Sequence, residues 1–230
     1  MSKKQDRDYL YLIWKSPETR SNYTVGELSK NGLYEFEYGH EIEKAIKEGF
    51  QLLTSFNDIN NKYVSEVLFP VFSSRLPDKK RRDIDEILAK YGLKEYDEYK
   101  LLKKSGARLP IDTIELIDPI FEDEEVIERT FYLAGPKHYI GCDGEFCDKS
   151  LDLAVDDLLE LGREPDNKFD GFAVKMFSTT GEHVGYIPRY YSKSVSEAME
   201  RGVEFVCTVK EFNKENNCNE CIKIHMKGVQ

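Results

Sequence analysis

The stretch Arg163-Glu-Pro-Asp-Asn-Lys-Phe-Asp-Gly-Phe-Ala-Val-Lys175 is the most distinctive part of this sequence of 230 residues. Pro165, Asp166 and Asn167 are residues typical of a turn. Asp170, which precedes a glycine, indicates a second turn before an apolar run. The pattern therefore predicts two successive turns that lead into a β-strand. Asn and Asp side chains in turns usually bond only to local backbone groups, so one interpretation gives Asn167 and Asp170 a purely structural role.

The segments that follow predict a hairpin and then a helix. Residues 173–178 and residues 183–189 both have the composition of strands, and the short Thr-Thr-Gly-Glu turn between them favours a β-hairpin. The next segment has helical spacing, with Ser192 or Ser194 as its N-cap and Gly202 as its end.

Further strands complete this half of the chain. One strand starts at Phe131, and residues 204–212 and 221–227 form two alternating strands around an Asn-rich turn. The apolar spacing of residues 151–161 fits either a helix or a strand. A hairpin, a helix and a second hairpin after an opening strand indicate a small β-barrel of SH3 or OB type with one packed helix.

The first half mixes strand and helix patterns, which predicts a small α+β domain and makes the fold class of the whole chain α+β. Gly26 lies within one strand pattern, where we expect a bend. The predicted strands are residues 9–15, 23–28, 33–38 and 111–117, and the predicted helices are residues 41–48, residues 96–104 and a segment through Ile84, Ile87 and Leu88 that Gly92 ends.

Residues 118–128 are a break in composition, with six acidic residues and no basic one. We interpret this segment as a linker, although a solvated acidic surface loop has the same composition. The predicted organisation is an α+β domain at residues 1–119, an acidic linker at residues 120–128 and the barrel at residues 129–230.

Charge limits the kinds of partner. The chain has 33 basic and 43 acidic residues and a net charge of −10. From Phe131 onward, 12 Lys/Arg against 17 Asp/Glu give −5, so the remaining −5 lies in the first 130 residues. A protein that coats duplex DNA normally presents a basic face, whereas one that holds only a strand end needs few phosphate contacts.

Apolar runs and cysteines indicate a soluble protein of the cytoplasm. The apolar run at residues 9–14 is too short for the core of a signal peptide, and nothing approaches the roughly 18–20 apolar residues of a membrane span. Five cysteines are an odd number, so we expect reduced thiols rather than a disulfide framework.

Neither a metal site nor a catalytic motif is predicted. The C-x-x-C pair Cys218/Cys221 has the spacing of zinc ligands, but Cys142/Cys147 is a looser pair far away in the sequence. The chain has no phosphate-binding loop, no H-E-x-x-H and no G-x-S-x-G motif. We therefore expect no metal, no cofactor and no enzymatic activity.

Three elements in register resemble the HIRAN domain. They are Gly135-Pro-Lys-His-Tyr-Ile-Gly141, the stretch from Arg163 to Lys175, and Gly181-Glu-His-Val-Gly-Tyr-Ile-Pro-Arg189. HIRAN sequences carry G-x-R-Y-Y-x-G, then an R-(D/E)-P-x-N-x-(Y/F)-D block, then a G-x-x-V-G motif that ends in Pro and Arg or Lys. The helix and the two strands that follow extend the resemblance to residue 227.

The resemblance implies a non-catalytic domain whose pocket takes the 3′-terminal nucleotides of single-stranded DNA. It implies that Tyr139 and Tyr186 stack on bases, that Asn167 and Asp170 bind the terminal sugar with its free 3′-hydroxyl, and that Lys137 contacts a phosphate. The positions that match the family pattern are Lys137, His138, Tyr139, Asn167, Phe169, Asp170, Tyr186 and Arg189.

Three of these positions depart from the family pattern. Lys137 replaces an arginine and loses its bidentate geometry, His138 replaces a tyrosine, and Phe169 replaces a tyrosine and lacks its hydroxyl. His138 is equally consistent with a surface residue that has no role. Asp170 has two interpretations as well, because its carboxylate can point at the pocket or at the backbone of the turn.

The first half is similar to the N-terminal subdomain of HipA-type kinases. The similarity rests on Val25-Gly-Glu-Leu28, residues 33–38, residues 68–78 and residues 101–106, with serine where the family has asparagine. The kinase elements themselves are absent, so the resemblance implies a fold and a docking surface for a protein partner. The predicted function is binding of single-stranded DNA near damaged, replicating or invading DNA; the alternative is a protein-interaction module.

Overall fold

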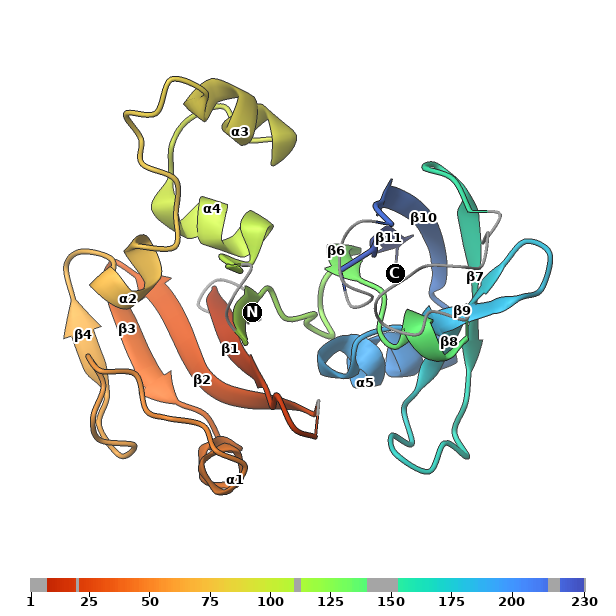
Figure 1. Ribbon diagram of the computed structural model, residues 1–230, viewed down its shortest axis with the longest axis horizontal. Coiled ribbons are helices and arrows are strands. Elements are labelled where there is room, and N and C mark those ends of the chain that lie inside the picture. Colours follow the sequence, from red (N-terminus) through yellow and green to blue (C-terminus); the bar gives the residue numbers. More distant parts are fainter. Residues whose placement is uncertain (1–7, 20, 110–112, 140–152, 215–219, 230) are drawn as a thin grey trace. The chain divides into compact units, whose positions relative to one another are not determined.

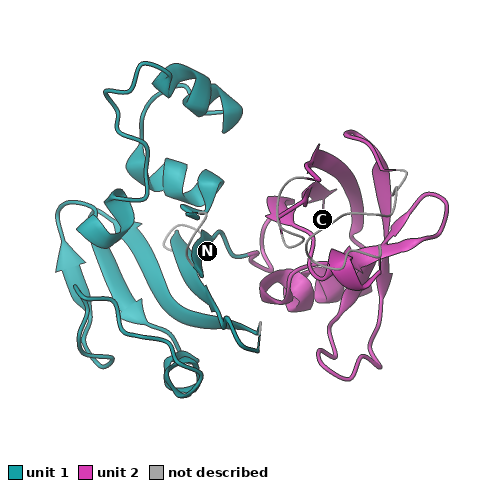
Figure 2. Cartoon of the chain, viewed as in Figure 1, with its two compact units in different colours: residues 1–119 teal, residues 120–230 magenta. Residues whose placement is uncertain are grey.

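The computed structural model divides the chain into two compact units, residues 1–119 and residues 120–230 (Figures 1 and 2). Each unit is described by itself. The structure describes residues 8–19, 21–109, 113–139, 153–214 and 220–229. None of the helices in these ranges is long and apolar enough to cross a membrane.

Unit 1 is built on a five-stranded antiparallel sheet with the strand order β4-β3-β2-β1-β5. This mixture of a sheet and short helices confirms the α+β expectation for the first half. The strands are β1 Tyr9–Lys15, β2 Asn22–Asn31, β3 Leu33–Tyr38, β4 Tyr63–Ser65 and β5 Ile114–Ile117, and the helices are α1 Ile42–Lys47, α2 Pro70–Ser73, α3 Ile84–Lys90 and α4 Glu98–Ser105.

Aromatic rings fill the core of unit 1. Phe36 is fully buried, and its ring centroid lies 4.3 Å from that of Phe56 and 5.5 Å from that of Phe72. Strand β2 continues through Gly26, and its pairing with β1 shifts register next to this residue, where Leu12 pairs with Gly26 and Ile13 pairs with Thr24. A Cβ at Gly26 would lie 2.6 Å from the ring of Phe36, so the glycine also permits a close approach of ring and backbone.

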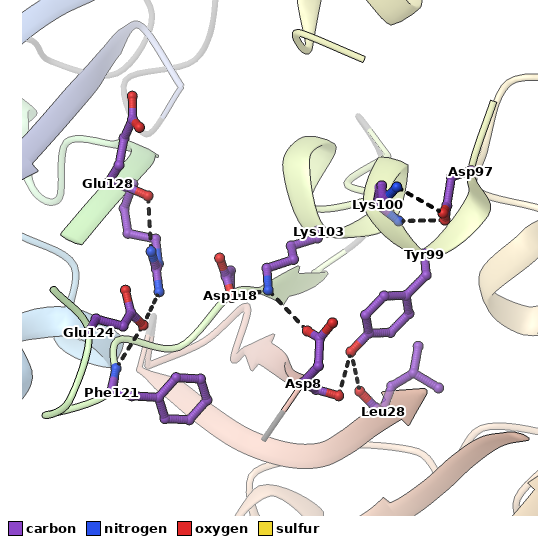
Figure 3. A network of polar contacts seen from close by, with 11 residues as sticks. Asp8, Leu28, Asp97, Tyr99, Lys100, Lys103, Asp118, Phe121, Glu124 and Glu128 are labelled. Carbon is purple, nitrogen blue, oxygen red and sulfur yellow. Dashed lines mark hydrogen bonds and ion pairs between the residues drawn. The ribbon is translucent and has the colours of Figure 1, made fainter. Parts of the chain in front are cut away.

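Helix α4 contacts the residues before the first strand and after the last strand of unit 1 (Figure 3). Its Lys103 ammonium lies 3.0 Å from a carboxylate oxygen of Asp8, before β1, and 3.2 Å from one of Asp118, after β5. The buried Tyr99 donates its hydroxyl hydrogen toward the carbonyl oxygens of Asp8, at 3.0 Å, and Leu28, at 3.4 Å. Gly106 ends the helix in a left-handed conformation, two residues after the predicted end of the helix at residue 104.

Unit 2 is a six-stranded antiparallel sheet with the order β6-β11-β10-β7-β8-β9, and a helix packs against it. The segment after β6 pairs with the end of β9 through Ala134 and Tyr186, so the sheet curls back on itself. The predicted barrel with one packed helix is confirmed. Its elements are β6 Val126–Tyr132, η1 Pro136–His138, β7 Leu158–Arg163, β8 Val174–Ser178, β9 His183–Tyr186, α5 Arg189–Glu200, β10 Glu204–Phe212 and β11 Ile222–Val229.

Helix α5 begins earlier than predicted. It starts at Arg189, directly after Pro188, and it has no side-chain cap, so neither Ser192 nor Ser194 is the N-cap. Ser192 is instead only 2% exposed, on the buried face of the helix. Proline before the first helical residue has a fixed φ and starts the helix without a serine cap.

The acidic segment also differs from the expected linker. Strand β6 begins at Val126, so the last three residues of this segment pair with β11 instead of connecting domains. Arg129, which is 9% exposed, donates to a carboxylate oxygen of Glu124 at 2.7 Å, and that carboxylate accepts from the backbone N–H of Phe121 at 2.9 Å (Figure 3). A nearly buried guanidinium needs a counter-ion, and Glu124 supplies it.

Candidate nucleic-acid interface

The closure of the barrel brings the turn η1 against β9. Ala134 and Tyr186 exchange two backbone hydrogen bonds of 2.9 Å. Gly185 makes this approach possible, since a Cβ there would lie 2.7 Å from Cγ of Leu133 and 2.8 Å from the carbonyl oxygen of Ala134. Gly135 has a φ of +68°, a left-handed conformation that turns the chain into η1.

Four aromatic side chains meet at this junction, and we call them the aromatic cluster: Tyr139, Phe177, His183 and Tyr186. The ring of Tyr139 lies 3.9 Å from that of His183 and 5.6 Å from that of Tyr186, measured between centroids. His183 lies 4.9 Å from Tyr186 and 5.4 Å from Phe177. Tyr139 is 40% exposed, so the cluster presents an aromatic surface to solvent.

A carboxylate contacts the cluster through the hydroxyl of Tyr186. Oε2 of Glu164 accepts from the hydroxyl of Tyr186 at 2.9 Å and from the side-chain amide of Asn167 at 2.7 Å. Its Oε1 lies 2.6 Å from the ammonium of Lys175. Hydrogen bonds from Lys175 and Asn167 lower the pKa of Glu164 to about 2, so this carboxylate is ionised at neutral pH.

The pKa values of Tyr186 and His183 are both shifted in the direction that favours the neutral form of the ring. Burial raises the pKa of Tyr186, and hydrogen bonds to Tyr139 and Glu164 raise it further. Burial also lowers the pKa of His183, whose Nε2 lies 3.0 Å from the carbonyl oxygen of Gly185. The rings of the cluster therefore offer faces for stacking, and the negative charge beside them belongs to Glu164.

Asn167 and Asp170 hold the loop before β8. Oδ1 of Asn167 accepts from the backbone N–H groups of Phe169, at 2.9 Å, and Asp170, at 3.1 Å. Oδ1 of Asp170 accepts from the N–H of Phe172 at 2.9 Å, and its Oδ2 accepts from the hydroxyl of Ser192 at 2.7 Å. Both side chains thus make the local turn contacts that the structural interpretation requires.

The structure joins Tyr139, Asn167 and Tyr186 into one network through Glu164 and His183. Asp170 is next to this network, because its N–H donates to Asn167. The other four expected site residues lie close to these residues in the sequence. Lys137 and the exposed His138 lie in η1, Phe169 is 89% exposed in the loop, and the exposed Arg189 begins α5.

Sequence reasoning did not identify Glu164, Lys175 or His183 as site residues. Glu164 directly follows Arg163, the last residue of β7. Lys175 lies opposite Tyr186 in the hairpin of β8 and β9. The predicted hairpin, combined with this register, could have placed Lys175 beside Tyr186.

The cysteines give no metal site within the described ranges. Cys207 and Cys221 are buried, and burial raises the pKa of the Cys207 thiol to about 12. The described residues contain no group of three or more potential metal-binding side chains. Cys142, Cys147 and Cys218 lie outside the described residues. The pair Cys142/Cys147 is therefore not described, and of the pair Cys218/Cys221 only Cys221 is described.

Unit 1 contains an open groove of about 800 Å³ between the turn that joins β2 to β3 and the start of α4. Its polar groups also serve the fold: Asp97 caps α4 by accepting from the N–H of Lys100 at 3.0 Å. The hydroxyl of Tyr96 donates to the carbonyl oxygen of Pro77 at 2.9 Å. The groove is lined by Lys30, Tyr34, Ser73, Leu76, Pro77, Asp78, Lys79, Glu95, Tyr96, Asp97 and Glu98.

Comparison with known families gives one match for each half. Residues 131–227 match the HIRAN domain, and residues 20–110 match the HipA N-terminal domain. The HIRAN domain of human HLTF is 17% identical over 47% of this chain and 81% of that one, with a TM-score of 0.36. A protein from Lactobacillus plantarum is 16% identical over 46% and 96%, with a TM-score of 0.37. Comparison with curated proteins gave no match.

Proposed function

This chain joins a HipA N-terminal domain at residues 20–110 to a HIRAN domain at residues 131–227, and from this premise we propose that it binds single-stranded DNA at a free 3′-hydroxyl end without catalysing a reaction. Membership of the HIRAN family supports DNA binding in general. The preference for a strand end and the lack of catalysis are our own extension. In this view the domain brings its HipA-like neighbour to damaged, replicating or invading DNA.

The observation that carries the proposal is the aromatic cluster. The ring of Tyr139 is 40% exposed beside Tyr186 and His183, and base stacking on an aromatic ring is worth about 1–3 kcal/mol per base. Stacking accepts any base, because every base has a π-face. The 89% exposed ring of Phe169 offers a second stacking surface on the neighbouring loop.

Among the described residues, few cations lie on the segments that carry or adjoin the cluster, which suits the end of a strand better than a long backbone. Lys137 precedes Tyr139 in η1, and Lys168 and Arg189 are exposed on the loop and at the start of α5. A strand end engages only a few phosphates, so an acidic chain can still hold it.

The protonation states support binding rather than catalysis. A general acid or base works best with a pKa near the working pH. The pKa of Glu164 is about 2 and its carboxylate is paired with Lys175, whereas the pKa of His183 lies below its ordinary value. The Glu164 carboxylate is therefore not suited to exchange a proton at neutral pH.

A titration of the full chain with labelled single strands tests the proposal. We expect linear strands with a 3′-hydroxyl to bind more tightly than 3′-phosphorylated or circular strands. Tyr139→Ala should weaken binding by about 5- to 150-fold, the equivalent of one stacked base. Tyr91→Ala, in unit 1, is the matched control and should bind as the wild type does.

Two results would contradict the proposal. Equal affinity for linear and circular strands would remove the preference for an end. No binding to any strand would remove DNA binding itself and favour the protein-interaction alternative.

A further inference from the structure

Two carboxylates lie near the aromatic cluster, and their partners differ. Asp170 accepts from the backbone N–H of Phe172 and from the hydroxyl of Ser192, which is 2% exposed. Both partners belong to the framework, because one forms the turn and the other is on the buried face of α5. The carboxylate of Asp170 therefore connects loop and helix.

Glu164 contacts the candidate site instead. Its partners are the side chains of Tyr186, Asn167 and Lys175. A carboxylate has about four acceptor positions, and these three partners occupy three of them. The side chain of Glu164 is 27% exposed, so solvent or a ligand can reach the remaining position.

We propose that Glu164, with Lys175 as its counter-ion, is the group that selects a 3′-hydroxyl over a 3′-phosphate. The inference rests on the proposed function and assigns the selective role to a residue other than Asp170. A terminal hydroxyl can donate to the remaining acceptor position of the carboxylate. A terminal phosphate carries about −1.5 to −2 charges and has mainly acceptors to offer, so its oxygens meet a carboxylate they cannot bond.

Lys175 sets the strength of this selection. Its ammonium lies 2.6 Å from Oε1 of Glu164 and partly neutralises the carboxylate. If Glu164 loses its charge, the ammonium remains and attracts a phosphate. If Lys175 loses its charge, the carboxylate remains and repels a phosphate more strongly. Removal of either partner of the same ion pair should thus change the end preference in opposite directions.

The measurement is the ratio of two dissociation constants of the full chain, that for a 3′-phosphorylated strand divided by that for a 3′-hydroxyl strand. Glu164→Gln should lower this ratio about tenfold, because its amide oxygen still accepts from Tyr186 and Asn167 while the charge is lost. Lys175→Met should raise the ratio about threefold, a smaller change because the lysine is partly solvated.

Two further variants are the controls. Glu160→Gln removes the same charge from an exposed position of β7 and should leave the ratio at its wild-type value. Asp170→Asn should change the ratio by less than about twofold, because its loss of charge acts on the turn and on Ser192. Melting curves of all variants identify those that are folded.

The outcomes separate this inference from the proposed function. Equal affinity of the wild type for both ends would overturn both. A wild-type preference that Glu164→Gln keeps and Asp170→Asn loses would overturn only the assignment to Glu164. A lower ratio in Lys175→Met would also overturn the assignment to Glu164. The measurement on Lys175→Met remains a test even where Glu164→Gln fails to fold.

Discussion

Replacement of Asp170 by alanine tests the framework role of this residue through stability. The change removes the acceptors of the Phe172 N–H, at 2.9 Å, and of the Ser192 hydroxyl, at 2.7 Å. Each hydrogen bond contributes about 1 kcal/mol net. Ser192 keeps a second acceptor, the carbonyl oxygen of Arg189 at 2.9 Å, so its buried hydroxyl is not left without a partner. We expect a loss of about 2 kcal/mol in the free energy of unfolding.

Two probes make the assay specific to unit 2. The only tryptophan, Trp14, lies in β1 and is buried in unit 1, so its fluorescence reports unfolding of that unit. Circular dichroism reports both units. For a domain of about 100 residues, 2 kcal/mol lowers the melting temperature by about 8 °C. We expect this shift in the ellipticity transition and no shift in the fluorescence of Trp14.

Asp170→Asn is the matched variant, because its amide oxygen can still accept a hydrogen bond from the turn. It should lower the free energy of unfolding by less than about 1 kcal/mol. The reasoning would be refuted if Asp170→Ala melted at the wild-type temperature and bound 3′-hydroxyl strands more weakly. That combination would mean that the carboxylate contacts the ligand and does little for the fold.

Three further expectations concern the barrel. Gly185→Ala should lower the free energy of unfolding by about 2 kcal/mol or more, because the new Cβ would lie 2.8 Å from a backbone oxygen. Gly171→Ala is the control, because a Cβ there meets nothing closer than 3.9 Å, and thermal melts compare the two variants. Residues 120–230 expressed alone should unfold in one cooperative transition, and a gradual loss of ellipticity would contradict this. Affinity for a 3′-hydroxyl strand should stay constant between about pH 8 and pH 7. Glu164, with a pKa of about 2, stays ionised over this range, and the lowered pKa of His183 favours its neutral form there. A tenfold change in affinity would oppose these assignments.

The local elements of the fold could be predicted because their signals are local. The strand at Leu33–Tyr38 alternates apolar and polar residues, and Gly106 ends α4, as its position after Lys103 and Lys104 indicates. Errors arose where a distant residue decides the outcome. Ser192 is not the N-cap of α5, because its hydroxyl donates to Asp170, which lies 22 positions earlier in the sequence.

In the candidate site too, residues within motifs could be predicted, and a residue whose role depends on distant partners could not. The resemblance to the HIRAN pattern named Tyr139, Asn167 and Tyr186, and the structure brings these three into one network. Glu164 was passed over, because its role depends on partners up to 22 positions away in the sequence.

The sequence alone determined the α+β class, the order of the elements and the three HIRAN motifs, because periodicity, turn residues and spacing are properties of short segments. Only the tertiary structure decided how these segments meet. The pairing of Ala134 with Tyr186 closes the barrel, and Ser192 turns inward to Asp170 rather than capping α5. Such contacts depend on strand register and on which side chains share a buried space, and a linear pattern specifies neither.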